Sequence, residues 1–437
     1  MQKKPILCAL FHILRASFPI FSYLCSQFMQ LIERYIFRMM WFAMMALPLS
    51  GDAQDTVENA QDSIGQEGSA YDDGLRFSLL TCTPGTDAYA HFGHTAILAE
   101  DEISGKTAVF NYGCFDATQK NFVMNFVKGD TNYQLDAETR KFFLWRYSES
   151  GNGVTEQELN LTAEEKKRLM KLLLENIRPE NQTYLYNWLY DNCTERARDV
   201  IERAVDGKVV YTRTERVVTV RQMLHEKLEK APWLKFGIDM VLGDEIDKLA
   251  ERRVQMFIPD YFQAEIDSAF IVNADGSRRP MVKATRQLLK PTVQEKASLL
   301  SPVVVFGLLL LITLVISYYD FKKKRQTVWF DVTLHTLQGL AGIIIAYLFF
   351  FSKHPGVDSN LLVWIFNPVA LCYALWIAVC HFRQKRNRLA VFNTIVCIAF
   401  IVLLMGEQQV FNTAVYLIAA ILFVRSVVQV ETNHARA

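Results

Sequence analysis

Five long apolar runs, separated by short polar loops, occupy the last third of the chain and constrain its fold more than any other feature. Each run is long enough to cross a hydrocarbon core of about 30 Å at about 1.5 Å per helical residue. We therefore predict an all-α membrane domain at residues 298–437 with five transmembrane helices. A chain of this kind is neither a purely cytosolic enzyme nor a disordered protein. The expected helix ranges are 302–319, 331–351, 361–380, 389–405 and 410–427.

The loops between these runs differ in charge, which predicts how the chain crosses the membrane. Basic clusters follow the first run at 322–325 and the third at 383–388. The loop at 352–360 has only one lysine and no arginine, and the turn at 406–408 has neither. By the positive-inside rule the two basic loops are cytoplasmic. The domain before the first run is then periplasmic, the C-terminus is cytoplasmic, and the chain is a multi-pass protein of the cytoplasmic (inner) membrane.

The N-terminal segment also indicates export. A basic region, an apolar core and two small residues follow one another at 34–53, which is the pattern of a secretion signal. Residues 1–53 are therefore a signal peptide, with translation starting near Met39, or alternatively a retained N-terminal anchor. Residues 54–74 are rich in Asp, Glu, Gln, Gly and Ser and predict a linker, which leaves 75–297 as the folded periplasmic domain.

Short β-rich runs followed by a helical pattern predict an α+β fold for the periplasmic domain. The runs at 76–83, 94–99 and 106–112 are bounded by turn-forming residues and favour a small antiparallel sheet. After Thr162 the apolar residues recur at helical spacing, and Thr162 with Glu165 has the spacing of a capping box. We therefore expect a small antiparallel sheet plus helices.

The most informative motif is Asp-Asn-Cys-Thr at 191–194. Asn192 is a typical N-cap, so Cys193 is expected in the first turn of a helix that runs to about Ala204. There the thiol faces unpaired backbone N–H groups and the positive end of the helix dipole, which lowers the pKa of a cysteine. A nucleophile is useful at such a position, although a cysteine that stands alone among aromatic residues is more commonly a buried core residue.

A cysteine nucleophile needs a base, and the domain has two histidines close together, His91 and His94. Because they are three residues apart, they point to opposite faces of an extended strand, and only one can face the thiol. We favour His94, because it leads directly into a predicted strand. Asn111 on the next strand would orient the imidazole through its side-chain amide. Cys193, His94 and Asn111 are thus the predicted catalytic residues.

Metal binding is the main alternative for a set of Cys and His residues. The chain has no CxxC or HExxH motif, and two histidines three apart in a strand are poorly placed for zinc. We therefore expect neither a metal nor a cofactor. An oxidising compartment leaves open a disulfide between Cys82 and Cys114. The 47 basic and 46 acidic side chains nearly cancel, so nucleic acid is not an expected partner.

These motifs resemble known enzyme families. The order Gly-His-Thr, Asn-Tyr-Gly and Asp-Asn-Cys-Thr is similar to the circularly permuted, papain-like NlpC fold, which includes lecithin retinol acyltransferase. The closer resemblance, over roughly 74–427, is to the Lnb family of bacterial lipoprotein N-acyltransferases. It rests on Phe92-Gly93-His94, on Tyr184-Leu185-Tyr186 and on the Asp-Asn-Cys-Thr-x-Arg-x-Arg-Asp motif at 191–199.

The resemblance implies an acyltransferase that moves the sn-2 acyl chain of a diacylglyceryl-cysteine to the α-amino group of the same cysteine. Cys193 would form a thioester, and His94 would act first as base and then as acid. The backbone N–H of Cys193 would stabilise the oxyanion. The partners would be diacylated lipoproteins and membrane lipid, and the domain would have the circularly permuted papain-like fold.

The same motifs supply further residues for substrate binding or support. Ion pairs on a helix surface are the commoner role for the charged ones, and core packing is the commoner role for the tyrosine. Asp331 and His335, at the cytoplasmic end of the second run, are expected at the membrane interface. The candidates are Asp191, Asn192, Thr194, Arg196, Arg198, Asp199, Tyr186 and His354.

Two other functions remain open. A cysteine hydrolase, a peptidase or amidase acting on cell-wall peptide, would use the same three residues with water as the acceptor. Five membrane helices favour a lipid substrate, because a wall hydrolase needs only one anchor. A noncatalytic receptor, whose exported domain binds a partner, would keep its function after Cys193→Ala.

Overall fold

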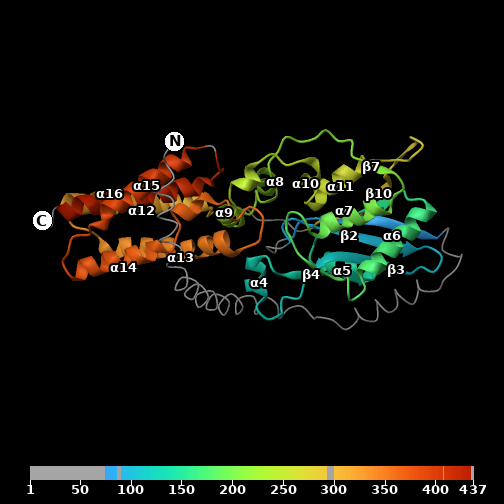
Figure 1. Ribbon diagram of the computed structural model, residues 1–437, viewed down its shortest axis with the longest axis horizontal. Coiled ribbons are helices and arrows are strands. Elements are labelled where there is room, and N and C mark those ends of the chain that lie inside the picture. The colour runs from blue at the N-terminus through green and yellow to red at the C-terminus, as the bar shows by residue number, and fades with distance from the viewer. Residues whose placement is uncertain (1–73, 86–89, 293–299, 407, 435–437) are drawn as a thin grey trace, which may run out of the picture.

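The computed structural model describes residues 74–85, 90–292, 300–406 and 408–434. The expected signal peptide or anchor and all but the last residue of the expected linker lie outside these residues. Figure 1 shows an elongated molecule, with a domain built on a β-sheet at one end and a bundle of long helices at the other. The α+β domain followed by a helical membrane region is thus confirmed.

An antiparallel sheet of seven strands lies at the centre of the periplasmic domain, in the order β10-β5-β1-β2-β3-β4-β6. The sheet is therefore larger than expected, because later, more polar segments extend both of its edges. Its strands are β1 Leu75–Cys82, β2 His94–Asp101, β3 Thr107–Cys114, β4 Asn132–Glu138, β5 Val154–Leu159, β6 Thr183–Leu185 and β10 Val282–Leu289. A second sheet contains β7 Lys208–Val210, β8 Phe270–Val272 and β9 Arg278–Pro280.

Helices cover both faces of the large sheet, and others join it to the bundle. The apolar side chains of one face form a core with α6 and α7, while the other face packs on α5. The predicted capping box at Thr162 and Glu165 is confirmed at the start of α6. The domain's helices are α4 Phe122–Lys128, α5 Arg140–Glu149, α6 Ala163–Asn176, α7 Cys193–Ala204, α8 Val220–Lys227, α9 Pro232–Val241, η1 Asp244–Asp247, α10 Arg252–Gln255 and α11 Pro259–Asp267.

A glycine fixes where β2 begins. Gly93 has φ 81°, in the left-handed region that favours glycine, and a Cβ atom there would lie 2.5 Å from the Cys82 carbonyl oxygen. Only glycine allows the chain to turn this closely against the end of β1. The following residue, His94, is thereby placed opposite Cys82 at the start of β2.

The described part of the membrane region has four helices that are long and apolar enough to cross a membrane. The third is broken near Asn367-Pro368, because proline has no backbone N–H to continue the helix. The fourth expected span, 389–405, forms the helix Leu389–Leu404, which is apolar but has only 16 residues. The helices are α12 Pro302–Lys323, α13 Val328–Phe351, η2 Leu361–Trp364, α14 Val369–Phe382, α15 Leu389–Leu404 and α16 Thr413–His434.

Asp331 and His335, expected at the cytoplasmic end of the second span, make polar contacts inside the helical bundle. Both side chains are buried inside the bundle. Arg425 of α16 donates to Asp331 at 2.7 Å and to Asp320 at 2.9 Å. His335 Nδ1 lies 2.8 Å from Gln338 Oε1. A charged side chain buried among helices requires an oppositely charged or hydrogen-bonding partner. Arg425 and Asp320 belong to other helices than Asp331, so the sequence of the second span alone does not reveal these contacts.

The periplasmic domain is fixed to the bundle by hydrogen bonds from two outer loops. Its segment 239–247 contacts the loops at 356–361 and 409–412, and we call this contact the domain–bundle interface. The Gly243 N–H donates to the Gly356 carbonyl at 2.6 Å. Further bonds join Asn360 Nδ2 to the Met240 carbonyl, Val410 N–H to the Asp247 carboxylate and Asn412 Nδ2 to the Asp239 carboxylate.

One buried arginine holds the domain side of this interface together. Arg221 of α8 donates to Asp239 at 2.9 Å and to Asp247 at 2.7 Å, and it also binds the carbonyls of Leu242 and Gly243. Its guanidinium therefore ties α8, α9 and η1 to one another where they meet the bundle. Because so many donors are satisfied, the contact is a defined interface rather than a loose tether.

Candidate active site

The Asp-Asn-Cys-Thr motif forms the start of helix α7. Asn192 Oδ1 accepts hydrogen bonds from the backbone N–H groups of Thr194 at 2.8 Å and Glu195 at 3.1 Å, so the predicted N-cap is confirmed. Asn192 Nδ2 donates to the carbonyls of Trp188 and Phe257. The side chain thus fixes the helix start from both sides. Cys193 occupies the first helical position, where the dipole of α7 favours a thiolate.

The structure brings the three expected catalytic side chains together in one row. The Cys193 thiol and the His94 imidazole are hydrogen-bonded to each other. His94 Nε2 lies 3.2 Å from Asn111 Oδ1. Since the amide oxygen only accepts, Nε2 carries the proton of this bond, and Nδ1 is left for the sulfur. Cys193 and His94 are partly exposed, so a substrate can reach them, whereas Asn111 is buried.

The protonation of the two reacting groups is coupled. Burial by itself would raise the pKa of the Cys193 thiol, but the His94 imidazolium, the Thr95 backbone N–H and the Thr194 hydroxyl together lower it below its usual value. Burial would likewise lower the pKa of His94, but the Cys193 thiolate and Asn111 raise it. Both shifts therefore stabilise the thiolate–imidazolium pair relative to the neutral thiol and imidazole.

The pKa directions predict how thiol reactivity depends on pH. We expect iodoacetamide to alkylate Cys193 well below the pH of about 8.5 at which an ordinary thiol is half ionised. In a His94→Gln variant the imidazolium that lowers the pKa of Cys193 is lost, whereas the burial that raises this pKa remains. The alkylation rate of Cys193 should then rise only above pH about 8.5. Peptide mass spectrometry of the labelled protein measures both rates.

Cys114 is an internal reference for this experiment, because burial raises its pKa to about 12. Its labelling should begin only at high pH and should be the same in parent and variant. Equal pH profiles for Cys193 in the two proteins would show that His94 does not ionise the thiol.

Glu138 of β4 is a member of the site that the sequence analysis missed. Asn111 Nδ2 donates to Glu138 Oε1 at 3.0 Å and to the Val109 carbonyl at 3.3 Å. These bonds direct the amide oxygen of Asn111 toward His94. Glu138 in turn forms an ion pair with Arg146 of α5. The only signal in the sequence was that Glu138 belongs to a polar segment near the next strand, which does not single it out.

Tyr184 was quoted above in a motif but was not among the expected site residues, and it also borders the site. A Cβ atom placed on Gly113 would lie 3.3 Å from Cys193 Cβ and 3.9 Å from the Tyr184 hydroxyl, so the hydroxyl and the nucleophile border the same small space. Gly113 has φ 87° and keeps this space open. The Tyr184 hydroxyl is buried, and no hydrogen-bond partner for it exists among the described residues. An unpaired buried hydroxyl is costly, which suggests that a bound molecule supplies the acceptor.

The charged residues of the motif hold the site in place through pairs within the chain. Arg196 donates to both carboxylate oxygens of Asp191, at 2.6 and 2.8 Å, and its guanidinium lies 3.5 Å from the centre of the Tyr184 ring. Arg196 therefore fixes the loop before the nucleophile and the ring of Tyr184 at once. Arg198 is buried and donates to Asp199 and to the Arg253 carbonyl.

The other supporting candidates lie in different surroundings. Thr194 is fully buried, and its hydroxyl is 3.1 Å from that of Thr95 on β2. Tyr186 stacks on Tyr133 with ring centroids 4.0 Å apart. His354 belongs to the loop after α13, and its Nε2 is 2.6 Å from the Phe126 carbonyl of α4. His354 thus contacts the domain through α4, as a link between domain and bundle.

Cys82 and Cys114, considered above as a disulfide, are free thiols in the structure. Cys82 ends β1 and Cys114 ends β3, with β2 between them. Alternate strands are about 10 Å apart, too far for a disulfide. Within the described residues no group of three or more His, Cys, Asp or Glu is arranged to hold a metal ion.

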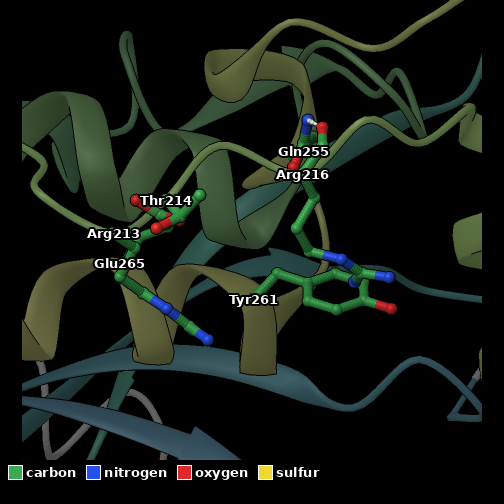
Figure 2. Close-up of a pocket in the computed structure, with 6 residues that line it drawn as sticks. All are labelled: Arg213, Thr214, Arg216, Gln255, Tyr261 and Glu265. Carbon is green, nitrogen blue, oxygen red and sulfur yellow. Dashed lines mark hydrogen bonds between the residues drawn. The ribbon is translucent and has the colours of Figure 1, made fainter.

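A cavity of about 220 Å³ lies elsewhere in the domain, between the segment at 213–216 and helices α10 and α11. Figure 2 shows the Arg216 side chain lying alongside the ring of Tyr261, and the two are 5.1 Å apart from guanidinium to ring centre. Arg216 also forms an ion pair with Glu226. The cavity lining includes none of the candidate catalytic residues.

Comparisons with known proteins agree with this architecture. Residues 67–226 match a family model described as the Lnb N-terminal periplasmic domain, and residues 294–435 match one described as the Lnb transmembrane domain. No curated protein and no solved structure matches the chain. The first matched range includes His94, Asn111 and Cys193, and the second includes all the membrane helices described above.

Proposed function

Because the chain belongs to the Lnb family of membrane-bound, lipoprotein-modifying enzymes, we propose that it is a lipoprotein N-acyltransferase that works through a Cys193 thioester. One observation carries the proposal. A cysteine with a lowered pKa is hydrogen-bonded to His94 in a domain that is fixed on membrane helices. Such a nucleophile can attack an acyl ester at the periplasmic surface of the cytoplasmic membrane, so the lipid need not be extracted into water.

In the first half-reaction the Cys193 thiolate attacks the carbonyl of the sn-2 ester of a diacylglyceryl-cysteine. The carbon–sulfur bond forms, the ester carbon–oxygen bond breaks, and the His94 imidazolium gives its proton to the departing oxygen. Asn111, oriented by Glu138, keeps the imidazole in line with the sulfur. The products are an acyl-enzyme thioester and a lipoprotein with a free glyceryl hydroxyl.

In the second half-reaction the α-amino group of the lipoprotein attacks the thioester carbonyl. The carbon–nitrogen bond forms, the carbon–sulfur bond breaks, and neutral His94 takes the proton from the amine. The thiolate–imidazolium pair is thereby restored. The negative oxygen in both steps would be stabilised by the Cys193 backbone N–H at the start of α7 and by the Tyr184 hydroxyl, whose acceptor is missing among the described residues.

This role of Tyr184 leads to a prediction. Tyr184→Phe keeps the ring that stacks under Arg196 and removes only the hydroxyl. We expect the rate of acyl transfer to fall about 10²- to 10³-fold, which is the usual loss for one oxyanion donor. The pH profile of Cys193 alkylation should remain that of the parent. A variant with parental transfer rate would remove Tyr184 from the mechanism.

The experiment that tests the function uses a host that lacks its own lipoprotein N-acyltransferase. The full-length chain is expressed there, and the N-terminus of one reporter lipoprotein is analysed by mass spectrometry. We expect an acyl chain on the α-amino group only when the chain is present. The mass of the product distinguishes the lyso form from a triacyl form. A diacylglyceryl terminus that stays unchanged, although the folded chain is in the membrane, would overturn the proposal and favour hydrolysis of wall peptides.

We also propose that all five helices span the membrane and that the C-terminus is cytoplasmic. The support comes from the two ends of α15. The residues after it, 409–412, bind the periplasmic domain, whereas the residues before it follow the far end of α14. A 16-residue helix of about 24 Å can span if its polar ends reach toward the interfaces. We expect that a cysteine introduced near the C-terminus is labelled only by a reagent added on the cytoplasmic side.

A further inference from the structure

Four aromatic side chains from three separate segments are in successive ring contact near the nucleophile. Phe115 stacks on Phe122 with centroids 5.2 Å apart, and Tyr133 lies 5.0 Å from Phe115. Tyr133 stacks in turn on Tyr186 at 4.0 Å. We call these four residues the aromatic row. Phe115 and Tyr186 are partly exposed, whereas Phe122 and Tyr133 are buried beneath them.

Two members of the aromatic row, Phe115 and Tyr186, follow closely along the chain after residues that border Cys193. Phe115 follows two residues after Gly113, whose Cβ position would be 3.3 Å from Cys193 Cβ. Tyr186 follows two residues after Tyr184, whose hydroxyl borders the same space. A flexible apolar chain lying on the exposed parts of Phe115 and Tyr186 would therefore come close to the sulfur.

The aromatic row is connected to the membrane helices through α4. Phe122 is the first residue of this short helix, and Met124 Sδ accepts a hydrogen bond from the Tyr347 hydroxyl of α13 at 3.3 Å. The loop at 352–354 then holds the last turn of α4, because it donates hydrogen bonds to three of its carbonyls. Figure 1 shows α4 between the sheet and the end of α13.

The outer part of α13 adds further apolar side chains next to α4. Tyr347 stacks on Phe351 at 5.3 Å, and on the same helix Ile344 and Phe350 are exposed. On α4 the Phe126 side chain is 41% exposed. Apolar side chains of α13, α4 and the aromatic row thus follow one another toward Cys193, and we call this succession the path.

We propose that one acyl chain of the lipid substrate reaches Cys193 along this path, passing over α4 at the outer end of α13. The inference rests on the proposed acyl transfer and adds to it the route and the binding surface of the lipid. The composition of α4 fits this occupant. Residues 122–127 have no charged side chain, while Lys120 and Lys128 flank them. An apolar stretch with basic ends suits an acyl chain below an anionic headgroup.

The test uses full-length Cys193→Ala protein, which binds lipid without turnover, in vesicles of phosphatidylethanolamine and phosphatidylglycerol. The vesicles contain a phospholipid with a diazirine in its acyl chain, and the labelled peptides are mapped after irradiation. We expect label on residues 115–126 in addition to the membrane helices. Phe142 and Trp145 of α5 are the reference surface, because both are 52% exposed, contact each other and lie away from the path.

A second measurement uses two matched variants. Phe126→Asn should lower the rate of acyl transfer about tenfold, as expected for the loss of one apolar contact with the acyl chain, while Phe142→Asn leaves it unchanged. Cys193 alkylation should be the same in both, which shows that the nucleophile is intact. The path would be overturned if residues 115–126 stayed unlabelled, or if α5 were labelled as strongly as they are. This holds even if the parent protein acylates its reporter. Labelling of the path without any acylation would leave the lipid surface standing and overturn the proposed function alone.

Discussion

Replacement of Cys193 by serine should abolish N-acylation of the reporter lipoprotein. A serine hydroxyl is close in size to the thiol, so helix α7 and its Asn192 cap should form as before. It does not ionise near neutral pH, however, and the ion pair with His94 is lost. We expect a decrease in rate on the order of 10⁴-fold, or to below detection, as for other enzymes that lose their nucleophile. Mass spectrometry of the reporter N-terminus measures the loss, with the amount of membrane-inserted protein determined in parallel.

Cys114→Ser is the matched control, because this thiol belongs to the same domain and burial raises its pKa. It should acylate the reporter like the parent. If the Cys193→Ser protein kept the parental product, the nucleophile would lie elsewhere and the thioester mechanism would be wrong.

Gly243→Ala should weaken the attachment of the domain to the bundle. An added Cβ would lie 2.3 Å from the Asn360 backbone nitrogen and 2.3 Å from the Ser359 carbonyl carbon. These are backbone atoms in the domain–bundle interface and have little freedom to move. We expect a loss of about 1–3 kcal/mol in the free energy of unfolding, the usual cost of overpacking. A lower thermal midpoint of the detergent-solubilised protein measures it.

The same variant separates attachment from chemistry. Gly243→Ala should acylate a lipoprotein in vesicles at least about tenfold more slowly, because the nucleophile no longer stays at the membrane surface. The alkylation rate of Cys193 by iodoacetamide should not change. Gly237→Ala is the control, since its Cβ would meet nothing within 4 Å and it lies in helix α9. A Gly243→Ala protein with parental stability and rate would show that the interface tolerates movement.

The elements with local sequence signals could be predicted. Asn192 caps the helix that begins with Cys193, and Thr162 caps α6 with Glu165, because capping depends on residues only three apart. The expected strands containing His94 and Asn111 exist as β2 and β3, although their ends differ by a few residues. The turn at Gly93 then places His94 at the strand start.

What could not be predicted depends on contacts between distant segments. Strand β10 pairs with β5 from more than 100 residues away, and its polar sequence gives no periodic signal for an edge strand. Asp331 is buried because Arg425, in the last helix, supplies its counter-charge. Glu138 and Tyr184 enter the site only through strand register, with Tyr184 opposite Tyr133 on β4.

If the chain acts as proposed, the firm attachment at the domain–bundle interface limits which lipoproteins it can modify. If the nucleophile is held at one height above the bilayer, a lipoprotein has to bring its N-terminal cysteine to that height while its folded body stays clear of the domain. The number of residues between that cysteine and the first folded element then decides reactivity. Lipoproteins with very few residues between the cysteine and the first folded element should be poor substrates. Lengthening this spacer should restore modification even if its amino-acid composition stays the same.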